Sequence, residues 1–157
     1  MLEPSAYLGC MDHALKQADL ARECDEVPVG AVVIQNGRVV GEGYNQREST
    51  NDPIGHAEIY ALRDASKRLG SWRLIGCSLV VTLEPCVMCL GAASQARVDE
   101  VIYAASDPKG GALSLGYRVH EDQRMNHRFE VRQQSDLRAE QILKDFFMKK
   151  RQERRSL

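Results

Sequence analysis

Residues 78–105 read SLVVTLEPCVMCLGAASQARVDEVIYAA, and this stretch decides the fold class of the chain. It begins with an apolar run, Ser78 to Leu83, that has the length and the β-branched residues of a buried strand. Pro85 fits the first turn of a helix, where a missing N–H does no harm, and this helix is expected to run to about Arg97. A second strand is expected from Val101 to Ala105. A strand–helix–strand unit of this kind favours two parallel strands joined by a right-handed crossover.

The chain upstream of this unit predicts a helix, a β-hairpin and a second helix. Apolar residues at helical spacing mark the first helix, Asn36-Gly37 is a strong hairpin turn, and Gly70 is suited to end the second helix. A polar stretch with Asp52-Pro53 is expected to form a loop between the hairpin and the second helix. The predicted ranges are Ser5 to about Glu23, Val29 to Ile34, Arg38 to Tyr44, Gln46 to Gly55 and Ala57 to Leu69.

The chain downstream of the unit predicts a long irregular segment, a short strand and a terminal helix. The segment runs from Asp107 to His127, and a loop of that length in a compact domain is usually functional. Phe129 to Arg132 is expected to add a strand. The apolar stripe of the terminal helix consists of Ala139, Ile142, Leu143, Phe146 and Phe147. Helices that alternate with strands after an initial hairpin predict an α/β fold, in which a mixed central sheet carries helices on both faces.

Length and composition indicate one globular domain that spans residues 1–157. The chain is 43% hydrophobic and 27% charged, and its formal net charge of −1 does not indicate a strongly basic nucleic-acid binder. No apolar run approaches the length of a membrane span, and the N-terminus lacks the features of a secretory signal. We therefore expect a cytoplasmic protein with no membrane partner.

The five cysteines do not form the pattern of a disulfide framework. Their number is odd and the chain looks cytosolic, a compartment in which thiols are kept reduced. Cys10, Cys24 and Cys77 are expected to be small buried hydrophobic residues, which is the ordinary state of a free cysteine. Cys86 and Cys89 form a C-x-x-C pair and are candidates for a different role.

His56, Cys86 and Cys89 are the candidate metal ligands. Side chains three apart on a helix share a face, so Cys86 and Cys89 can direct two thiolates at one ion, and a helix N-terminus favours the thiolate form. His56 precedes another predicted helix and can supply the third ligand. Three protein ligands leave a tetrahedral zinc ion with one open position, which is typical of a catalytic site rather than a structural one. We therefore predict one Zn²⁺ ion per chain.

Glu58 is the candidate for proton transfer. Residues two apart do not share a helix face, so Glu58 is poorly placed to join His56 as a fourth ligand. A carboxylate beside the ion can take a proton from an activated water molecule and return it to a ring nitrogen and a leaving amine. Alone, a C-x-x-C pair could be a redox pair, and a single histidine is more often structural. The combined order H-x-E…P-C-x-x-C resembles the signature of the zinc deaminases that act on nucleobases.

Six segments, which include both metal motifs, resemble those of a known family. They are residues 26–31, 41–45, 52–58, 81–89, 125–128 and 146–147, the last followed by a basic tail. On these segments the chain resembles the bacterial tRNA-specific adenosine deaminases, the TadA family of the cytidine/deoxycytidylate deaminase superfamily, over nearly its whole length. The resemblance implies a three-layer α/β/α cytidine-deaminase-like fold, conversion of the wobble adenosine of a tRNA anticodon to inosine, and a homodimer.

The resemblance also implies which residues meet the nucleotide. Val29 and Asn45 are expected to line the base pocket. Leu83 and Asn126 are expected near the flipped nucleotide, and Asp107 near its ribose. Chemistry on a stacked base requires extrusion of that base, so the expected partner is a tRNA anticodon stem-loop whose target base turns into the pocket.

Three short stretches depart from that family and leave alternatives open. Ile54-Gly55 stands where the family usually has Thr-Ala, and the loop 110–116 lacks the family's Gly-Ser-Leu in its usual register. Asn51-Asp52-Pro53 is similar to the guanine deaminases of the same superfamily. The first alternative is a free nucleobase deaminase that acts on guanine or cytosine with the same zinc chemistry. The second, of another class, is a non-catalytic RNA-binding module stabilised by zinc.

The C-terminal tail and the other histidines have ordinary explanations as well as functional ones. Residues 149–155 carry five cations and one anion, which fits a solvated helix face or a contact with RNA phosphates. The family resemblance favours the RNA contact. His127 is expected to be a partly buried structural residue, and His13 and His120 are expected to be solvated.

Overall fold

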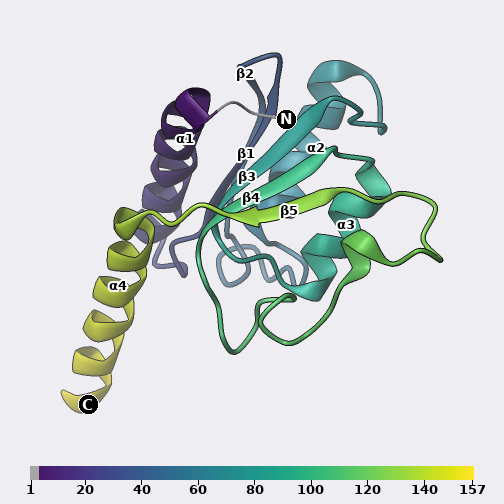
Figure 1. Cartoon of the computed structure of the whole chain (residues 1–157). Coiled ribbons are helices and arrows are strands. Elements are labelled where there is room, and N and C mark those ends of the chain that lie inside the picture. Colours follow the sequence, from purple (N-terminus) through teal and green to yellow (C-terminus); the bar gives the residue numbers. More distant parts are fainter. Residues whose placement is uncertain (1–3) are drawn as a thin grey trace.

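A computed structural model describes residues 4–157, without the side chains of residues 4, 5 and 8. Within this range, five strands form one mixed sheet and four α-helices lie against it (Figure 1). The helices are α1 (Pro4–Glu23), α2 (Ala57–Leu69), α3 (Val87–Ala96) and α4 (Leu137–Arg155), with a 3-10 turn, η1 (Val119–Glu121). The strands are β1 (Gly30–Gln35), β2 (Arg38–Tyr44), β3 (Cys77–Leu83), β4 (Glu100–Ala105) and β5 (Glu130–Gln133).

The strand order β2-β1-β3-β4-β5 confirms the predicted mixed sheet. Strand β1 pairs antiparallel with β2 and with β3, whereas β3–β4 and β4–β5 are parallel. The parallel β3–β4 pair is the strand–helix–strand unit expected from residues 78–105. The predicted hairpin turn is also confirmed, since Asn36 and Gly37 have φ angles of 50° and 72°, as a tight two-residue hairpin turn requires.

Two hydrophobic cores separate the three layers. One core joins α2 and α3 to one face of the sheet and includes Ala61, Leu90 and Leu79. The other joins α1 and α4 to the opposite face and includes Met11 and Ala139. Figure 1 shows the two pairs of helices on the two sides of the sheet. The three-layer α/β/α arrangement is therefore as predicted, and residues 4–157 contain no helix that could cross a membrane.

Gly30 allows α1 to lie directly against the sheet. A Cβ at this position would lie 2.0 Å from the Ala14 carbonyl oxygen and 2.4 Å from the Ala18 nitrogen, both backbone atoms. We expect Gly30→Ala to lower the free energy of unfolding by about 3 kcal/mol, the upper end of the usual range for overpacking. Gly9→Ala, in α1 itself, is the control, because nothing lies within 4 Å of its Cβ. It should be neutral or stabilise by about 0.5 kcal/mol. Equal urea midpoints for the two variants would contradict the close approach.

Two predictions about helix ends and stripes were wrong in detail. Helix α3 begins at Val87 with Cys86 as its N-cap, so Pro85 precedes the helix and does not lie in its first turn. Phe147 is 44% exposed, although Phe146 in the same predicted stripe is buried. Successive side chains on an α-helix point about 100° apart, so Phe147 lies at the edge of the apolar face that Ala139, Ile142 and Phe146 share.

Two predictions about burial were also wrong. Cys24 is exposed, because it follows the last residue of α1 in a turn at the surface. His120 is only 8% exposed, because it lies in η1, which packs against α3 and β5. Its carbonyl oxygen accepts a hydrogen bond from the Phe129 N–H at 3.1 Å, and the two rings lie 6.0 Å apart.

Candidate active site

The sheet topology brings the ends of four strands to one edge of the molecule. Residues Gly30 and Tyr44 are paired in β1 and β2, and residues Leu83 and Ala105 are paired in β3 and β4. The chain therefore enters β1, and leaves β2, β3 and β4, at the same edge. Helices α2 and α3 start from this edge, after β2 and β3 respectively. Carboxyl ends of strands and amino ends of helices are where open α/β sheets usually bind ligands.

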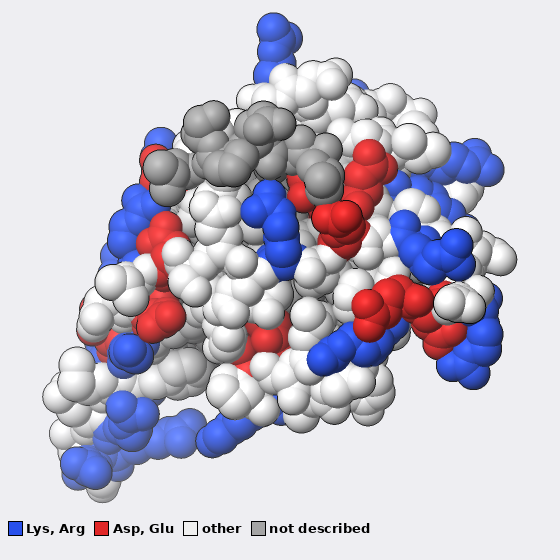
Figure 2. Space-filling model, viewed as in Figure 1, with Lys and Arg blue, Asp and Glu red and all other residues white. Residues whose placement is uncertain are grey.

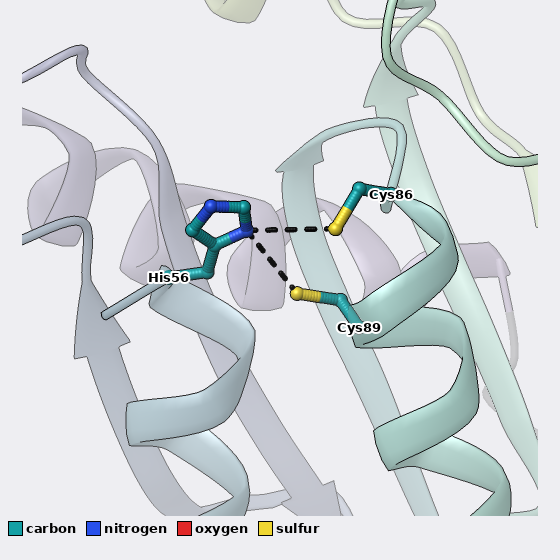
Figure 3. Close-up of side chains that lie close together, drawn as sticks. All are labelled: His56, Cys86 and Cys89. Atoms are coloured by element: carbon teal, nitrogen blue, oxygen red, sulfur yellow. Dashed lines mark hydrogen bonds between the residues drawn. The ribbon is translucent and has the colours of Figure 1, made fainter. Parts of the chain in front are cut away.

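Three side chains that could hold a metal ion meet at the starts of these two helices (Figure 3). His56 is the N-cap of α2 and Cys86 the N-cap of α3, both with extended backbone, and Cys89 lies in the first turn of α3. The Nδ1 atom of His56 lies 3.6 Å from Sγ of Cys86 and 3.4 Å from Sγ of Cys89. All three donor atoms lie within 4.8 Å of one another. The structure thus brings the three predicted ligands together.

The donor set fits a tetrahedral zinc site. Zinc prefers sulfur at about 2.3 Å and imidazole nitrogen at about 2.0–2.1 Å, so two such donors on one tetrahedral ion lie about 3.5 Å apart. The observed separations of 3.6 Å and 3.4 Å straddle that value. Nδ1 is the ring nitrogen turned toward the sulfurs, a detail that the sequence did not specify.

The two thiols influence each other's pKa in opposite directions. Hydrogen bonds with Cys89 and with His56 lower the pKa of Cys86 to about 4. A hydrogen bond to Cys86, together with burial, raises the pKa of Cys89. Metal ligation requires both sulfurs as thiolates and the imidazole in its neutral form, so binding of a cation would be coupled to release of protons.

Glu58 lies in the first turn of α2, beside the ligand cluster and outside it. Its side chain is buried, with 4% of the residue exposed. Burial raises the pKa of Glu58 to about 7, against the opposing influence of a backbone hydrogen bond and of His56. A carboxyl group with a pKa near neutrality can both accept and release a proton at the pH of a cell. A cation held by the neighbouring ligands would lower that pKa, because it favours the charged carboxylate.

A small pocket of about 80 Å³ opens onto this cluster. Four of the five residues expected to meet the nucleotide line it, namely Val29, Asn45, Leu83 and Asp107, together with His56, Glu58 and Cys86. The Asn45 side chain is oriented by two hydrogen bonds, to the Val27 carbonyl oxygen at 3.1 Å and from the Arg47 N–H at 3.3 Å. Asn126 is the exception, because it is exposed in the segment after η1 and does not line this pocket.

Glu84 is a pocket residue that sequence reasoning missed. It lines the same pocket and is 4% exposed. The signal that could have found it is its position, between the last residue of a buried strand and the Pro85-Cys86 pair. A charged residue there cannot reach bulk solvent easily, because the chain turns from the sheet into the site at that point.

Comparison with known proteins places these features in a family. The family model described as MafB19-like deaminase matches residues 7–151. The chain is 43% identical over 130 residues to a tRNA-specific adenosine deaminase of Streptococcus pyogenes serotype M1, which covers 83% of this chain and 75% of the relative. It is 42% identical over 149 residues to a tRNA-specific adenosine deaminase of Haemophilus influenzae, which covers 92% of this chain and 85% of the relative.

Solved structures show the same similarity in three dimensions. A structure from a study of A-to-I editing by tRNA:A34 deaminases at the wobble position is 41% identical, with a TM-score of 0.81, and the match covers 87% of this chain and 99% of that one. A guanine deaminase of Bacillus subtilis is 35% identical, with a TM-score of 0.61, over 74% of this chain and 71% of that one. These matches confirm the cytidine-deaminase-like fold predicted from the sequence.

Proposed function

This chain belongs to the tRNA-specific adenosine deaminase family, and from that premise we propose that it converts adenosine to inosine at the wobble position of a tRNA anticodon. The observation that carries the proposal is the convergence of a His-Cys-Cys cluster, a buried carboxyl group and a small pocket at one edge of the sheet. Residues 1–157 would act as one deaminase domain, in a cytoplasmic homodimer. A non-catalytic zinc module would have no use for Glu58 in that position.

We propose that His56, Cys86 and Cys89 hold one Zn²⁺ ion per chain. When bound, zinc supplies a Lewis acid that makes a coordinated water molecule a better nucleophile. Glu58 would accept a proton from the attacking water and deliver it to the ring nitrogen beside C6 while the water oxygen bonds to C6. It would then carry the second proton of that water to the amine as the bond between C6 and the amine breaks. Water and adenosine thus give inosine and ammonia, with Glu58 returned to its starting state.

The base would enter the pocket beside Glu58. Val29 and Leu83 offer apolar surface to its faces, while the oriented amide of Asn45 offers hydrogen bonds to its edge. Asp107, which also lines the pocket, would contact the ribose of the same nucleotide. Asn126 remains a prediction, because it could meet only the part of the nucleotide that lies outside the pocket.

A groove beside the base pocket supports an RNA partner. It measures about 750 Å³ and is lined by residues of α4, by the turn that follows α1, and by Glu48 and Ser49. Lys and Arg side chains gather at the C-terminal end of α4, at the lower left of Figure 2. In the groove wall, Lys150 forms an ion pair with Asp25, and Arg151, Arg154 and the exposed ring of Phe147 lie beside it. Val27 contacts both the groove and the base pocket. It lines the groove, and its carbonyl oxygen accepts a hydrogen bond from the side-chain amide of Asn45, which lines the base pocket.

Arg151 and Arg154 should therefore contact RNA phosphates. We expect Arg151→Ala and Arg154→Ala each to weaken binding of an anticodon stem-loop and to flatten the dependence of log K on log salt by about one unit. Lys144→Ala is the matched control, since it removes one cation from the same helix away from the groove. Fluorescence anisotropy over a salt series measures both effects. The groove is not the RNA surface if the control and the arginine variants behave alike.

The experiment that decides the substrate compares inosine formation in an anticodon stem-loop with ammonia release from free guanine and cytosine. We expect efficient turnover of the stem-loop and little turnover of either free base, because a free base has no phosphates for the groove to meet. The similarity to a guanine deaminase makes guanine the important comparison. Efficient turnover of guanine without turnover of the RNA would replace this proposal with a nucleobase deaminase.

A further inference from the structure

Glu84 holds a buried carboxylate in the pocket wall that the deamination chemistry does not use. Its two oxygens accept hydrogen bonds from one residue of the following loop. Oε2 accepts the Ser114 N–H at 3.2 Å, and Oε1 accepts the Ser114 hydroxyl at 2.8 Å. Tyr103 lies against the same group, and burial together with the Glu84 carboxylate raises the pKa of Tyr103, so its phenol stays protonated. A buried carboxylate needs such donors, because it has given up its hydration.

The loop is built to approach that carboxylate closely. A Cβ at Gly111 would lie 1.3 Å from Oε2 and 2.2 Å from Cδ of Glu84, so only glycine leaves room for the contact. The φ angle of Gly111 is not positive, and the requirement is therefore one of space. The next residue, Ala112, donates its N–H to the Pro85 carbonyl oxygen at 2.8 Å. Glu84 and Pro85 together thus anchor residues 111–114.

The anchored loop carries Asp107 at its other end. The Asp107 carbonyl oxygen accepts the Gly111 N–H at 2.9 Å. Its Oδ1 accepts the N–H groups of Lys109 at 3.2 Å and Gly110 at 3.0 Å. The side chain of Asp107 is therefore oriented by a turn whose far side rests on Glu84.

We propose that Glu84 and Ser114 form a latch that positions Asp107 beside the base pocket, so that both are positioning residues that act through Asp107. The inference rests on the proposed function of the site, because Asp107 matters only if a ribose lies against it. Ser114 thus links the loop that follows Asp107 to the residue before the Pro85-Cys86 pair.

Ser114→Ala tests the latch with little risk to folding. It removes the hydroxyl bond to Oε1 and keeps the backbone bond to Oε2. Ser114→Thr is the matched rescue, since it keeps the hydroxyl and position 114 is exposed enough to accept a methyl group. Ser114→Ala and Ser114→Thr are each prepared as single variants and in combination with Asp107→Ala, and every protein is loaded with zinc before it is tested. The affinity for a fluorescent anticodon stem-loop is measured for all of them, because it is accessible even where turnover is slow.

We expect Ser114→Ala to weaken RNA binding about 5-fold, within the range for one lost hydrogen bond, and Ser114→Thr to restore it. In the Asp107→Ala background, Ser114→Ala should have no further effect, because the residue it positions is gone. An equal 5-fold loss in both backgrounds would overturn the proposal, as would failure of the threonine variant to restore binding.

Amide hydrogen exchange of residues 107–114 gives a readout that does not depend on RNA. Exchange should be faster in Ser114→Ala than in the unmodified protein and normal in Ser114→Thr. Unchanged exchange in Ser114→Ala means that no latch exists. If the unmodified protein neither binds nor deaminates the stem-loop, the proposed function has failed, and a normal exchange response would then confirm only that the latch orders the loop.

Discussion

Glu58→Gln is expected to reduce deamination of an anticodon stem-loop by at least about 100-fold, the usual scale for a positioned acid–base group. Glutamine has nearly the same size and can occupy the same buried position, but it cannot carry a proton from water to a leaving amine. The variant should keep one zinc ion per chain, because Glu58 lies beside the His56, Cys86 and Cys89 cluster and outside it. Single-turnover kinetics with parallel zinc analysis measure both quantities.

The same substitution at a surface position, Glu140→Gln, provides the control for Glu58→Gln. Glu140 lies in α4 and pairs with Lys144 at the surface, so Glu140→Gln removes a carboxylate without touching the pocket. It should leave zinc content and turnover unchanged. A zinc-replete Glu58→Gln protein that turns over at near-normal rates would rule out the proton-transfer role.

The turns, strands and helices that depend on residues close together in the sequence were predictable. The Asn36-Gly37 turn requires positive φ at two successive residues, and that requirement shows in the residue types themselves. The β3–α3–β4 unit was predictable because two short apolar runs flank a helix-length segment. The His56, Cys86 and Cys89 cluster was predictable because the spacing of its cysteines, combined with a distant histidine, is a chemical signature rather than a propensity.

The features that depend on tertiary contacts were not predictable in the same way. Burial of His120 depends on the packing of η1 against α3 and β5, and no local periodicity in the sequence predicts those contacts. The role of Glu84 depends on Ser114, thirty residues later, which comes within 2.8 Å of it only in the folded chain. Exposure of Phe147 depends on which part of the broad apolar stripe of α4 faces the rest of the protein, since Phe146 beside it is buried.

Cys86→Ser is expected to lose most of its zinc and, with it, essentially all deaminase activity. A serine hydroxyl is a far weaker ligand than a thiolate, and two remaining ligands do not make a stable site. Cys24→Ser is the control for thiol loss, because Cys24 is exposed and lies outside the His56 cluster. It should retain one zinc ion per chain by elemental analysis. Full zinc occupancy in Cys86→Ser would overturn the ligand assignment.

Thermal melting shows whether Cys86→Ser loses zinc because a ligand is missing or because the fold is damaged. The comparison is between the Tm of metal-free Cys86→Ser and the Tm of the metal-free unmodified protein. Cys86 is the N-cap of α3 but makes no side-chain capping hydrogen bond, since its sulfur is turned toward His56. Serine is among the best N-cap residues and typically adds about 1 kcal/mol over a residue that does not cap. Metal-free Cys86→Ser should therefore melt at or slightly above the temperature of the chelator-treated unmodified protein. Added zinc should then raise the Tm of the unmodified protein but not the Tm of Cys86→Ser, because a ligand stabilises only a folded state that binds it. A variant that melts well below the metal-free parent would mean that Cys86 serves the fold rather than the metal.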